Sequence, residues 1–170
     1  MFTLVVGGAA SGKSEYAEQL ILRAGALPRY YVATMEPFGA EARARIARHR
    51  VLRAQKRFET IECPVGLSRV LLPARGAALL ECLSNLAANE LYSPAGAGGE
   101  QGGAGRGVDG GERPRRGGGD DGGGSAYAGD TGTYLRVLAA ANRALAARAD
   151  AVCEVACGLP RYYKGEGAAL

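Results

Sequence analysis

The chain contains three short apolar runs, at residues 2–6, 77–81 and 151–157. Runs of this length, bounded by glycine, proline or charged residues, are typical of strands buried on both faces of a parallel sheet. Residues 27–35 predict a further strand that ends at Ala-Thr-Met, and the alternating residues 58–62 predict a short one. The pattern therefore predicts five strands spread along the chain.

Helical periodicity fills the intervals between these strands. It covers residues 15–24, about 40–56, 66–72, about 84–91 and 133–148. Strands that alternate with helices form parallel sheets, whose ligands bind at the carboxyl ends of the strands. We expect one α/β domain over the 170 residues, with a mainly parallel sheet and helices on both faces.

Residues 7–14 read Gly-Gly-Ala-Ala-Ser-Gly-Lys-Ser, the G-x-x-x-x-G-K-[ST] spacing of a phosphate-binding P-loop. Glycines bring backbone N–H groups close to phosphate oxygens. Lys13 can reach the β- and γ-phosphates, and Ser14 can offer its hydroxyl to Mg²⁺. An apolar strand precedes the loop and a helix follows it, as the motif requires. The sequence therefore predicts a nucleoside triphosphate site.

The helix over residues 40–56 has a divided surface. Alanines and one valine fall on one face, which we expect to be buried: Ala44, Ala47, Val51 and Ala54. The single histidine, His49, falls on the opposite side with Arg45, Arg53 and Lys56. Two interpretations stay open: a solvated charged face, or a nucleotide-phosphate site that contains a nucleophilic imidazole. No aromatic residue interleaves with the arginines, which disfavours nucleic-acid binding.

Glu81 ends the strand over residues 77–81. P-loop enzymes keep a metal-side carboxylate at such a position, so Ser14 and Glu81 are candidate Mg²⁺ ligands. The alternative is that Glu81 caps the helix that follows, because acidic residues are favoured at helix starts.

Residues 93–132 differ from the rest of the chain. They hold most of its 27 glycines and contain no apolar run and no period. Such a composition buries too little apolar surface to offset the entropy of ordering it, so we expect disorder there.

Bulk composition excludes several classes. The formal net charge of +4 does not by itself imply nucleic acid, and no apolar run is long enough to span a bilayer. The N-terminal strand leads straight into the P-loop, so we expect no signal peptide and a cytoplasmic location. The four cysteines lack the spacing of a zinc site and are expected to be buried free thiols: Cys63, Cys82, Cys153 and Cys157. The last two should share one face of a strand.

Several motifs together resemble the bifunctional adenosylcobinamide kinase/adenosylcobinamide-phosphate guanylyltransferase family of cobalamin biosynthesis. They are the P-loop, Tyr-Val-Ala-Thr at 31–34, Arg-Ile-Ala-Arg-His-Arg at 45–50, Thr-Ile-Glu at 60–62, Leu-Leu-Glu-Cys at 79–82, Asn-Arg-Ala-Leu-Ala at 142–146, Ala-Asp-Ala-Val at 149–152 and Cys-Gly-Leu-Pro at 157–160. The P-loop is common to many families, whereas the arginine-histidine and Leu-Leu-Glu-Cys segments are more specific.

This resemblance implies two reactions. A nucleoside triphosphate, ATP or GTP, phosphorylates adenosylcobinamide, and GMP then passes from GTP through a guanylylated His49 to the new phosphate, with Mg²⁺ as cofactor. It also implies a homotrimer without nucleic-acid or membrane partners. The catalytic residues would be His49 and Lys13. The implied nucleotide contacts are Gly7, Gly8, Ala9, Ala10, Ser11, Gly12, Lys13, Ser14, Ala33, Thr34, Met35, Arg50, Val51, Leu52, Arg53, Glu62 and Glu81.

One departure from the family pattern concerns residues 93–132. Members of the family carry further helix and a hydrophobic strand at this place, and here glycine-rich sequence stands instead. Two explanations are open: a degenerate insertion, or a shifted reading frame in the coding sequence. Two other functions also stay open, another small-molecule P-loop kinase that makes no use of His49, and a nucleotide-binding remnant without catalysis.

Overall fold

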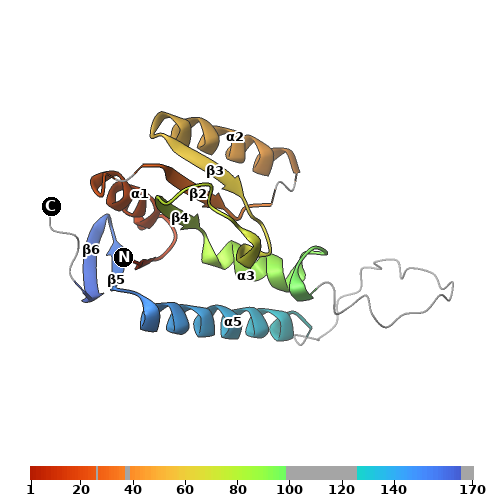
Figure 1. Cartoon of the computed structure of the whole chain (residues 1–170). Coiled ribbons are helices and arrows are strands. Elements are labelled where there is room, and N and C mark those ends of the chain that lie inside the picture. The colour runs from red at the N-terminus through yellow and green to blue at the C-terminus, as the bar shows by residue number, and fades with distance from the viewer. Residues whose placement is uncertain (26, 37–38, 99–125, 166–170) are drawn as a thin grey trace.

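The computed structural model of the chain describes residues 1–25, 27–36, 39–98 and 126–165. Its strands are β1 (Thr3–Val6), β2 (Arg29–Ala33), β3 (Phe58–Glu62), β4 (Ala77–Glu81), β5 (Ala151–Ala156) and β6 (Leu159–Lys164). Its helices are α1 (Lys13–Arg23), α2 (Gly39–Gln55), α3 (Leu83–Tyr92) and α5 (Ala126–Arg148), with a single 3₁₀ turn at Leu67–Arg69. Figure 1 shows α2 lying along β3 on one side of the strands and α5 running below them.

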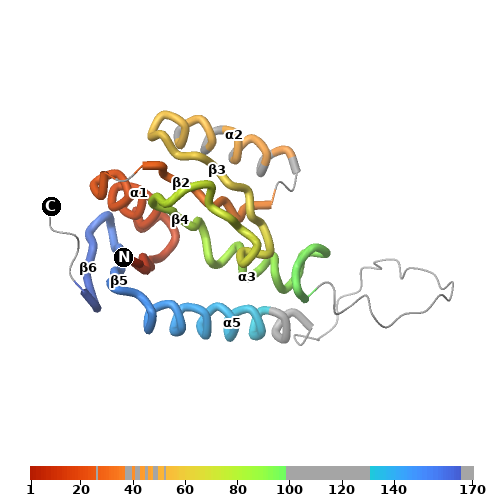
Figure 2. Tube along the Cα trace, in the orientation of Figure 1, coloured from red at the N-terminus to blue at the C-terminus, as the bar shows by residue number. Residues whose placement is uncertain are grey.

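The described strands form two three-stranded sheets, ordered β1-β5-β6 and β3-β2-β4. All pairs are parallel except β5 with β6. The mixed α/β class with parallel strands is thus confirmed. A single sheet was expected, and that expectation is wrong for the described residues because no strand joins β1 to β4. Figure 2 shows how β1, at the start of the chain, lies beside β5 near its end.

The main core lies where α1 packs on the second sheet. Tyr31, Ala33 and Phe58 are buried there, against Ile21 and other half-buried apolar side chains of α1 and β4. The rings of Tyr31 and Phe58 meet edge to face, with centroids 5.9 Å apart. This is the favoured arrangement of two aromatic quadrupoles. Helix α1 also contacts β1 and β5, so it spans both sheets.

The C-terminal segment corrects two predictions. The strand expected over residues 151–157 ends at Ala156, and Cys157 and Gly158, both with positive φ, form a tight hairpin turn into β6, a strand that the sequence analysis did not predict. Pro160 is tolerated because β6 lies at the edge of its sheet. Cys157 therefore lies beyond β5 and is exposed, whereas Cys153 is buried inside it. All four cysteines are free, and Cys82 is half-buried.

Two helix boundaries also differ from prediction. The segment 66–72 holds only one 3₁₀ turn, because Val70 already has extended backbone dihedrals. Helix α5 begins at Ala126, inside the stretch expected to be disordered, and residues 93–96 make a hydrogen-bonded turn after α3. The remainder of that expectation, on residues 99–125, lies outside the described residues. Within the described part of the chain, no helix is long and apolar enough to cross a membrane.

Candidate functional site: a P-loop and an arginine pocket on one sheet edge

The P-loop turns sharply between β1 and α1. Gly12 caps α1 with φ of 88°, and a Cβ there would lie 3.2 Å from the Cα of Gly158. Both the dihedral and the close contact require glycine. The Lys13 ammonium donates to the Gly8 carbonyl oxygen at 3.0 Å, so its charge lies across the loop. Among the described residues, the buried Ser11 hydroxyl finds no hydrogen-bond partner.

Ser14 and Glu81 meet at the carboxyl ends of β1 and β4. The Ser14 hydroxyl donates to Glu81 Oε1 at 2.7 Å. Glu81 does not cap the helix that follows. Cys82 caps α3 instead, and its Sγ accepts the N–H of Asn85. A serine hydroxyl beside a carboxylate is a pair of hard oxygen donors, which suits Mg²⁺. The described residues contain no cluster of three or more His, Cys, Asp or Glu that could hold a metal.

Strand register places the predicted acidic residues in one row. In the parallel pairs of the second sheet, Ala33 lies opposite Glu62 of β3 on one side and Glu81 of β4 on the other. Neighbouring strands lie about 4.8 Å apart, so the backbones of the two glutamates are about 10 Å apart across the sheet edge. Glu81 bonds to Ser14 of the P-loop, and Glu62 bonds to Arg50 of α2. A single nucleotide is therefore long enough to reach both glutamates.

Two polar side chains hold this edge in place. Thr34 is fully buried, and its Oγ1 donates to the Cys82 carbonyl oxygen and accepts the Cys82 N–H, at 3.0 and 2.8 Å. Asn89 of α3 donates through Nδ2 to the carbonyl oxygens of Thr34 and Pro64, at 2.8 and 2.9 Å. The ends of β2, β3 and β4 are thus fastened to α3. Sequence reasoning missed Asn89, whose only signal was an amide inside a predicted helix.

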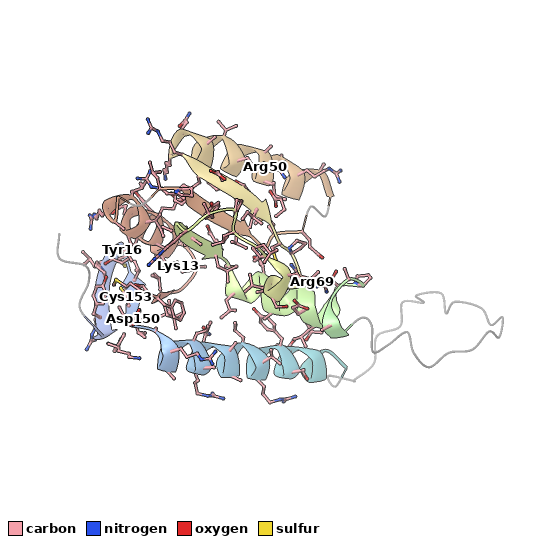
Figure 3. The ribbon with its side chains drawn as sticks, in the orientation of Figure 1. Lys13, Tyr16, Arg50, Arg69, Asp150 and Cys153 are labelled. Atoms are coloured by element: carbon pink, nitrogen blue, oxygen red, sulfur yellow. The ribbon has the colours of Figure 1, made fainter. Side chains whose placement is uncertain are left out.

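A pocket of about 370 Å³ opens between α2 and the end of β3. Figure 3 shows Arg50 on α2. Arg50 donates through Nε and Nη2 to Glu62 Oε1, at 3.0 and 2.8 Å, and so joins the helix to the strand end. Met35 lines the same pocket, as do two residues that the sequence analysis did not select, Arg43 and Ile46. Their signal was the spacing i, i+3 and i+7 that they share with Arg50.

The predicted division of α2 is wrong. Val51 is 61% exposed and Ala44, Ala47 and Ala54 are exposed too, whereas Arg53, expected at the surface, is 4% exposed. The Arg53 guanidinium lies over the Tyr31 ring, 4.1 Å from its centroid. Burial lowers the pKa of Arg53, and the carboxylate of Glu62 opposes that shift. A face made of alanines is too weakly apolar to determine which side of a helix is buried. The contact of Arg53 with the aromatic ring of Tyr31 determines it here.

His49 lies on α2, one residue before Arg50 and one turn before Arg53. The backbone of α2 thus brings the predicted nucleophile to the helix that forms the pocket. The side chains of His49 and Leu52 lie outside the described residues.

Comparison with known proteins identifies the family. Residues 3–103 match the sequence profile described as cobinamide kinase / cobinamide phosphate guanyltransferase. The chain belongs to this family. The match covers the P-loop, α2 and the row of glutamates, and it confirms the resemblance seen in the sequence.

Two curated relatives share 38% identity with the chain. One is the bifunctional adenosylcobalamin biosynthesis protein CobU of Salmonella typhimurium, aligned over 97 residues, 55% of this chain and 51% of the relative. The other is the bifunctional adenosylcobalamin biosynthesis protein CobP of Pseudomonas aeruginosa, aligned over 87 residues, 49% of each protein. The chain thus spans about half the length of the curated relatives it matches.

Proposed function

We propose that the chain phosphorylates adenosylcobinamide with a nucleoside triphosphate and then transfers GMP from GTP to the new phosphate. The products of the second reaction are adenosylcobinamide-GDP and pyrophosphate. The observation that carries the proposal is the single sheet edge on which Glu81, bound to Ser14 of the P-loop, and Glu62, bound to Arg50, flank Ala33. Family membership and the names of both relatives support the same pair of reactions.

The kinase step needs alignment and charge neutralisation more than covalent chemistry. The P-loop N–H groups would hold the phosphates, and Lys13 would exchange the Gly8 carbonyl for the β- and γ-phosphate oxygens. Ser14 and Glu81 would hold Mg²⁺, which neutralises phosphate charge when bound. The cobinamide hydroxyl oxygen then bonds to the γ-phosphorus, its proton passes to solvent, and the nucleoside diphosphate leaves as the bond from the γ-phosphorus to the bridging oxygen breaks.

The guanylyl step uses His49 as nucleophile. A neutral imidazole nitrogen bonds to the α-phosphorus of GTP as pyrophosphate leaves, and a phosphate oxygen of the phosphorylated cobinamide then displaces the imidazole. The attacking imidazole must be unprotonated, a form that histidine reaches near neutral pH. Arg50 and Arg43 also supply positive charge for the departing pyrophosphate.

The remaining predicted contacts fit around these two steps. Ala33, Thr34 and Met35 form the β2 end between the two glutamates, and Met35 reaches the α2 pocket. Val51 and Leu52 belong to the turn of α2 between Arg50 and Arg53. The pocket volume of about 370 Å³ is within the range of small-molecule sites.

We further propose a cytoplasmic homotrimer whose subunits complete each other's sites. The segment from the 3₁₀ turn to Leu72 supports a subunit contact, since Leu71 is 87% exposed and Leu67 and Leu72 are exposed too. Light scattering coupled to gel filtration should give three times the chain mass. Leu71→Asp should lower that mass if this segment is the contact.

Product analysis tests the proposed function. The chain, Mg²⁺, GTP and adenosylcobinamide should yield adenosylcobinamide phosphate, then adenosylcobinamide-GDP and pyrophosphate. Lys13→Ala should lose both products, whereas His49→Asn should accumulate the phosphate. A wild-type chain that stops at the phosphate would be a kinase alone. Retained GTP binding with neither product would identify a nucleotide-binding remnant.

A further inference from the structure

The P-loop helix α1 carries two polar side chains one helical turn apart. Ser14 donates to Glu81 at the end of β4. Glu18 follows four residues later, so both lie along one side of the helix. The Glu18 carboxylate accepts a hydrogen bond from the Lys56 ammonium group and forms an ion pair with it. Glu18 is only 15% exposed, and a carboxylate so far removed from water requires a cation, which Lys56 supplies.

Lys56 belongs to the turn that closes helix α2. Its N–H donates to the Arg53 carbonyl oxygen at 3.0 Å, and the Arg57 N–H donates to that of Ala54 at 3.0 Å. Arg57 has a φ of 59°, the left-handed conformation that commonly ends a helix. The Lys56 carbonyl oxygen accepts Nη1 of Arg29, at the start of β2, at 3.3 Å. The end of α2 is therefore held by α1 through the Lys56 ammonium group and by β2 through the Lys56 carbonyl oxygen.

The Glu18 carboxylate also acts on Arg53, three residues before Lys56. Burial lowers the pKa of Arg53, and the negative charges of Glu62 and Glu18 oppose that shift. Helix α2 lies against β3, and α1 lies against β4, which is two strands away. Glu18 thus connects two helices that pack on different strands, and it does so at the cations that end α2.

The Glu18–Lys56 pair connects the two parts of the proposed site. Lys13 is in the first turn of α1, five residues before Glu18. His49 is in α2, seven residues before Lys56. At 1.5 Å per residue, these separations are about 8 Å and about 10 Å along the two helices. Because both run through helical backbone, a displacement at the pair would move His49 relative to the P-loop.

Guanylyl transfer is more sensitive to that displacement than nucleotide binding is. An attacking atom must come within about 3.5 Å of the atom it attacks, and a misplacement of about 1 Å can slow a reaction about 100-fold. Nucleotide affinity comes largely from the P-loop, whose phosphate contacts do not pass through α2. The proposed kinase step does not use His49 either. A loosened α2 should therefore slow one of the two reactions selectively.

We propose that Glu18 is a positioning residue for guanylyl transfer: through Lys56 it fixes helix α2, and with it His49, relative to a nucleotide bound in the P-loop. Glu18 takes no part in the chemistry itself. The inference rests on the proposed function, because it assigns a role within the transfer of GMP through His49.

Neutral variants of the pair test the inference. Glu18→Gln and Lys56→Met keep the length of each side chain and remove its charge. At saturating GTP, the rate of acid-labile GMP uptake from α-labelled GTP should fall about tenfold in each variant. The Kd for GTP and the rate of adenosylcobinamide phosphorylation should both stay within about threefold of the wild type. An equal loss of both reactions, or unchanged labelling, would overturn the inference.

Two further variants examine whether Glu18 acts through Lys56. Lys56→Arg keeps the charge and should label within about threefold of the wild type, unlike Lys56→Met. The double variant Glu18→Gln/Lys56→Met should label about as fast as the slower single variant, because the first substitution already breaks the pair. Losses that multiply to about 100-fold in the double variant would mean that the two side chains act independently, which contradicts the proposed route.

Tyr16→Phe is the matched control on the same helix. The hydroxyl groups of Tyr16 and Tyr162 are hydrogen-bonded at 2.6 Å, so this contact joins α1 to β6 and not to α2. Labelling by Tyr16→Phe should stay within about twofold of the wild type, and thermal unfolding shows how far each variant is destabilised. A loss of labelling as large as that of Glu18→Gln would mean that any loosening of α1 slows the reaction, and the specific role of Glu18 would be wrong.

Hydrogen exchange separates a failure of this inference from a failure of the proposed function. In Glu18→Gln, the amides of Ala47 and Arg50 in α2 should exchange at least about threefold faster than in the wild type, whereas those of α3 should not change. If the wild type takes up label, but the variant labels and exchanges as the wild type does, the inference is overturned and the proposed function stands. A wild-type chain that binds GTP and never labels would overturn the proposed transfer through His49, and the role of Glu18 with it.

Discussion

The P-loop and helix α2 reach the same edge of one sheet, but the sequence determines them in different ways. The P-loop works through its backbone, and its position is set by glycines and by the Ser14–Glu81 contact. Helix α2 works through side chains whose direction depends on a partner, the ring of Tyr31 under Arg53. A backbone site can therefore be recognised from spacing, whereas a side-chain site depends on which face of its helix packs.

The largest expected effect is in the P-loop. Lys13→Ala removes the charge placed between two phosphates, so phosphoryl transfer should be lost and GTP affinity should fall about 10- to 100-fold. Calorimetry with GTP and thermal unfolding measure the two quantities separately. Lys164→Ala is the matched control, since the exposed Lys164 ammonium donates to the carbonyl oxygens of Ala146 and Ala147 in the last turn of α5, and GTP affinity should stay within twofold. If the folded Lys13→Ala variant binds GTP with unaltered affinity, the P-loop is not the nucleotide site.

On α2, Arg53→Ala should lower the free energy of unfolding of the chain, in addition to any effect on GTP binding. It removes a buried stem and a cation–π contact at 4.1 Å, which together contribute about 2 kcal/mol to the free energy of unfolding. Urea titration of the variant and the wild type measures this difference. A loss below about 0.5 kcal/mol would show that Arg53 is not packed on Tyr31.

The Arg50–Glu62 pair should matter for ligand binding more than for folding. Both side chains are partly exposed, so Arg50→Ala should lower the free energy of unfolding by less than about 1 kcal/mol. If the α2 pocket holds phosphates, GTP affinity should fall about tenfold. Arg143→Ala removes the same charge from an exposed position on α5 and should leave GTP affinity as it is.

The smallest effect is expected at Val51, which the sequence pattern placed on the buried face. Its side chain is 61% exposed, so Val51→Ala should change the free energy of unfolding by no more than about 0.5 kcal/mol. The sequence pattern predicts a larger loss of stability at Val51 than at Arg53, and the structure predicts the reverse. A larger loss at Val51 than at Arg53 would restore the sequence-based orientation of α2.

These cases show which parts of the fold and of the candidate site could be predicted from the sequence. It located the P-loop, the strands around it and Glu81, because glycine spacing and short apolar runs have few alternative structures. It misplaced the buried face of α2, because alanine and arginine are both compatible with either side of a helix. It also missed β6, because the residues that end a strand are the same ones that make a hairpin turn into a further strand. The separation of β1 from β4 agrees with the glycine-rich sequence at residues 93–132, which stands where the family carries a hydrophobic strand.

Covalent labelling of His49 tests the central proposal most directly. The chain contains one histidine, and a bond between phosphorus and imidazole is labile in acid and stable in base, unlike a serine or threonine ester. With Mg²⁺ and α-labelled GTP, the wild-type chain should take up acid-labile label, whereas γ-labelled GTP should leave none because pyrophosphate departs. His49→Asn should abolish the label and retain GTP binding. Acid-labile GMP on His49→Asn, or a wild-type chain that binds GTP and never labels, would contradict transfer through His49.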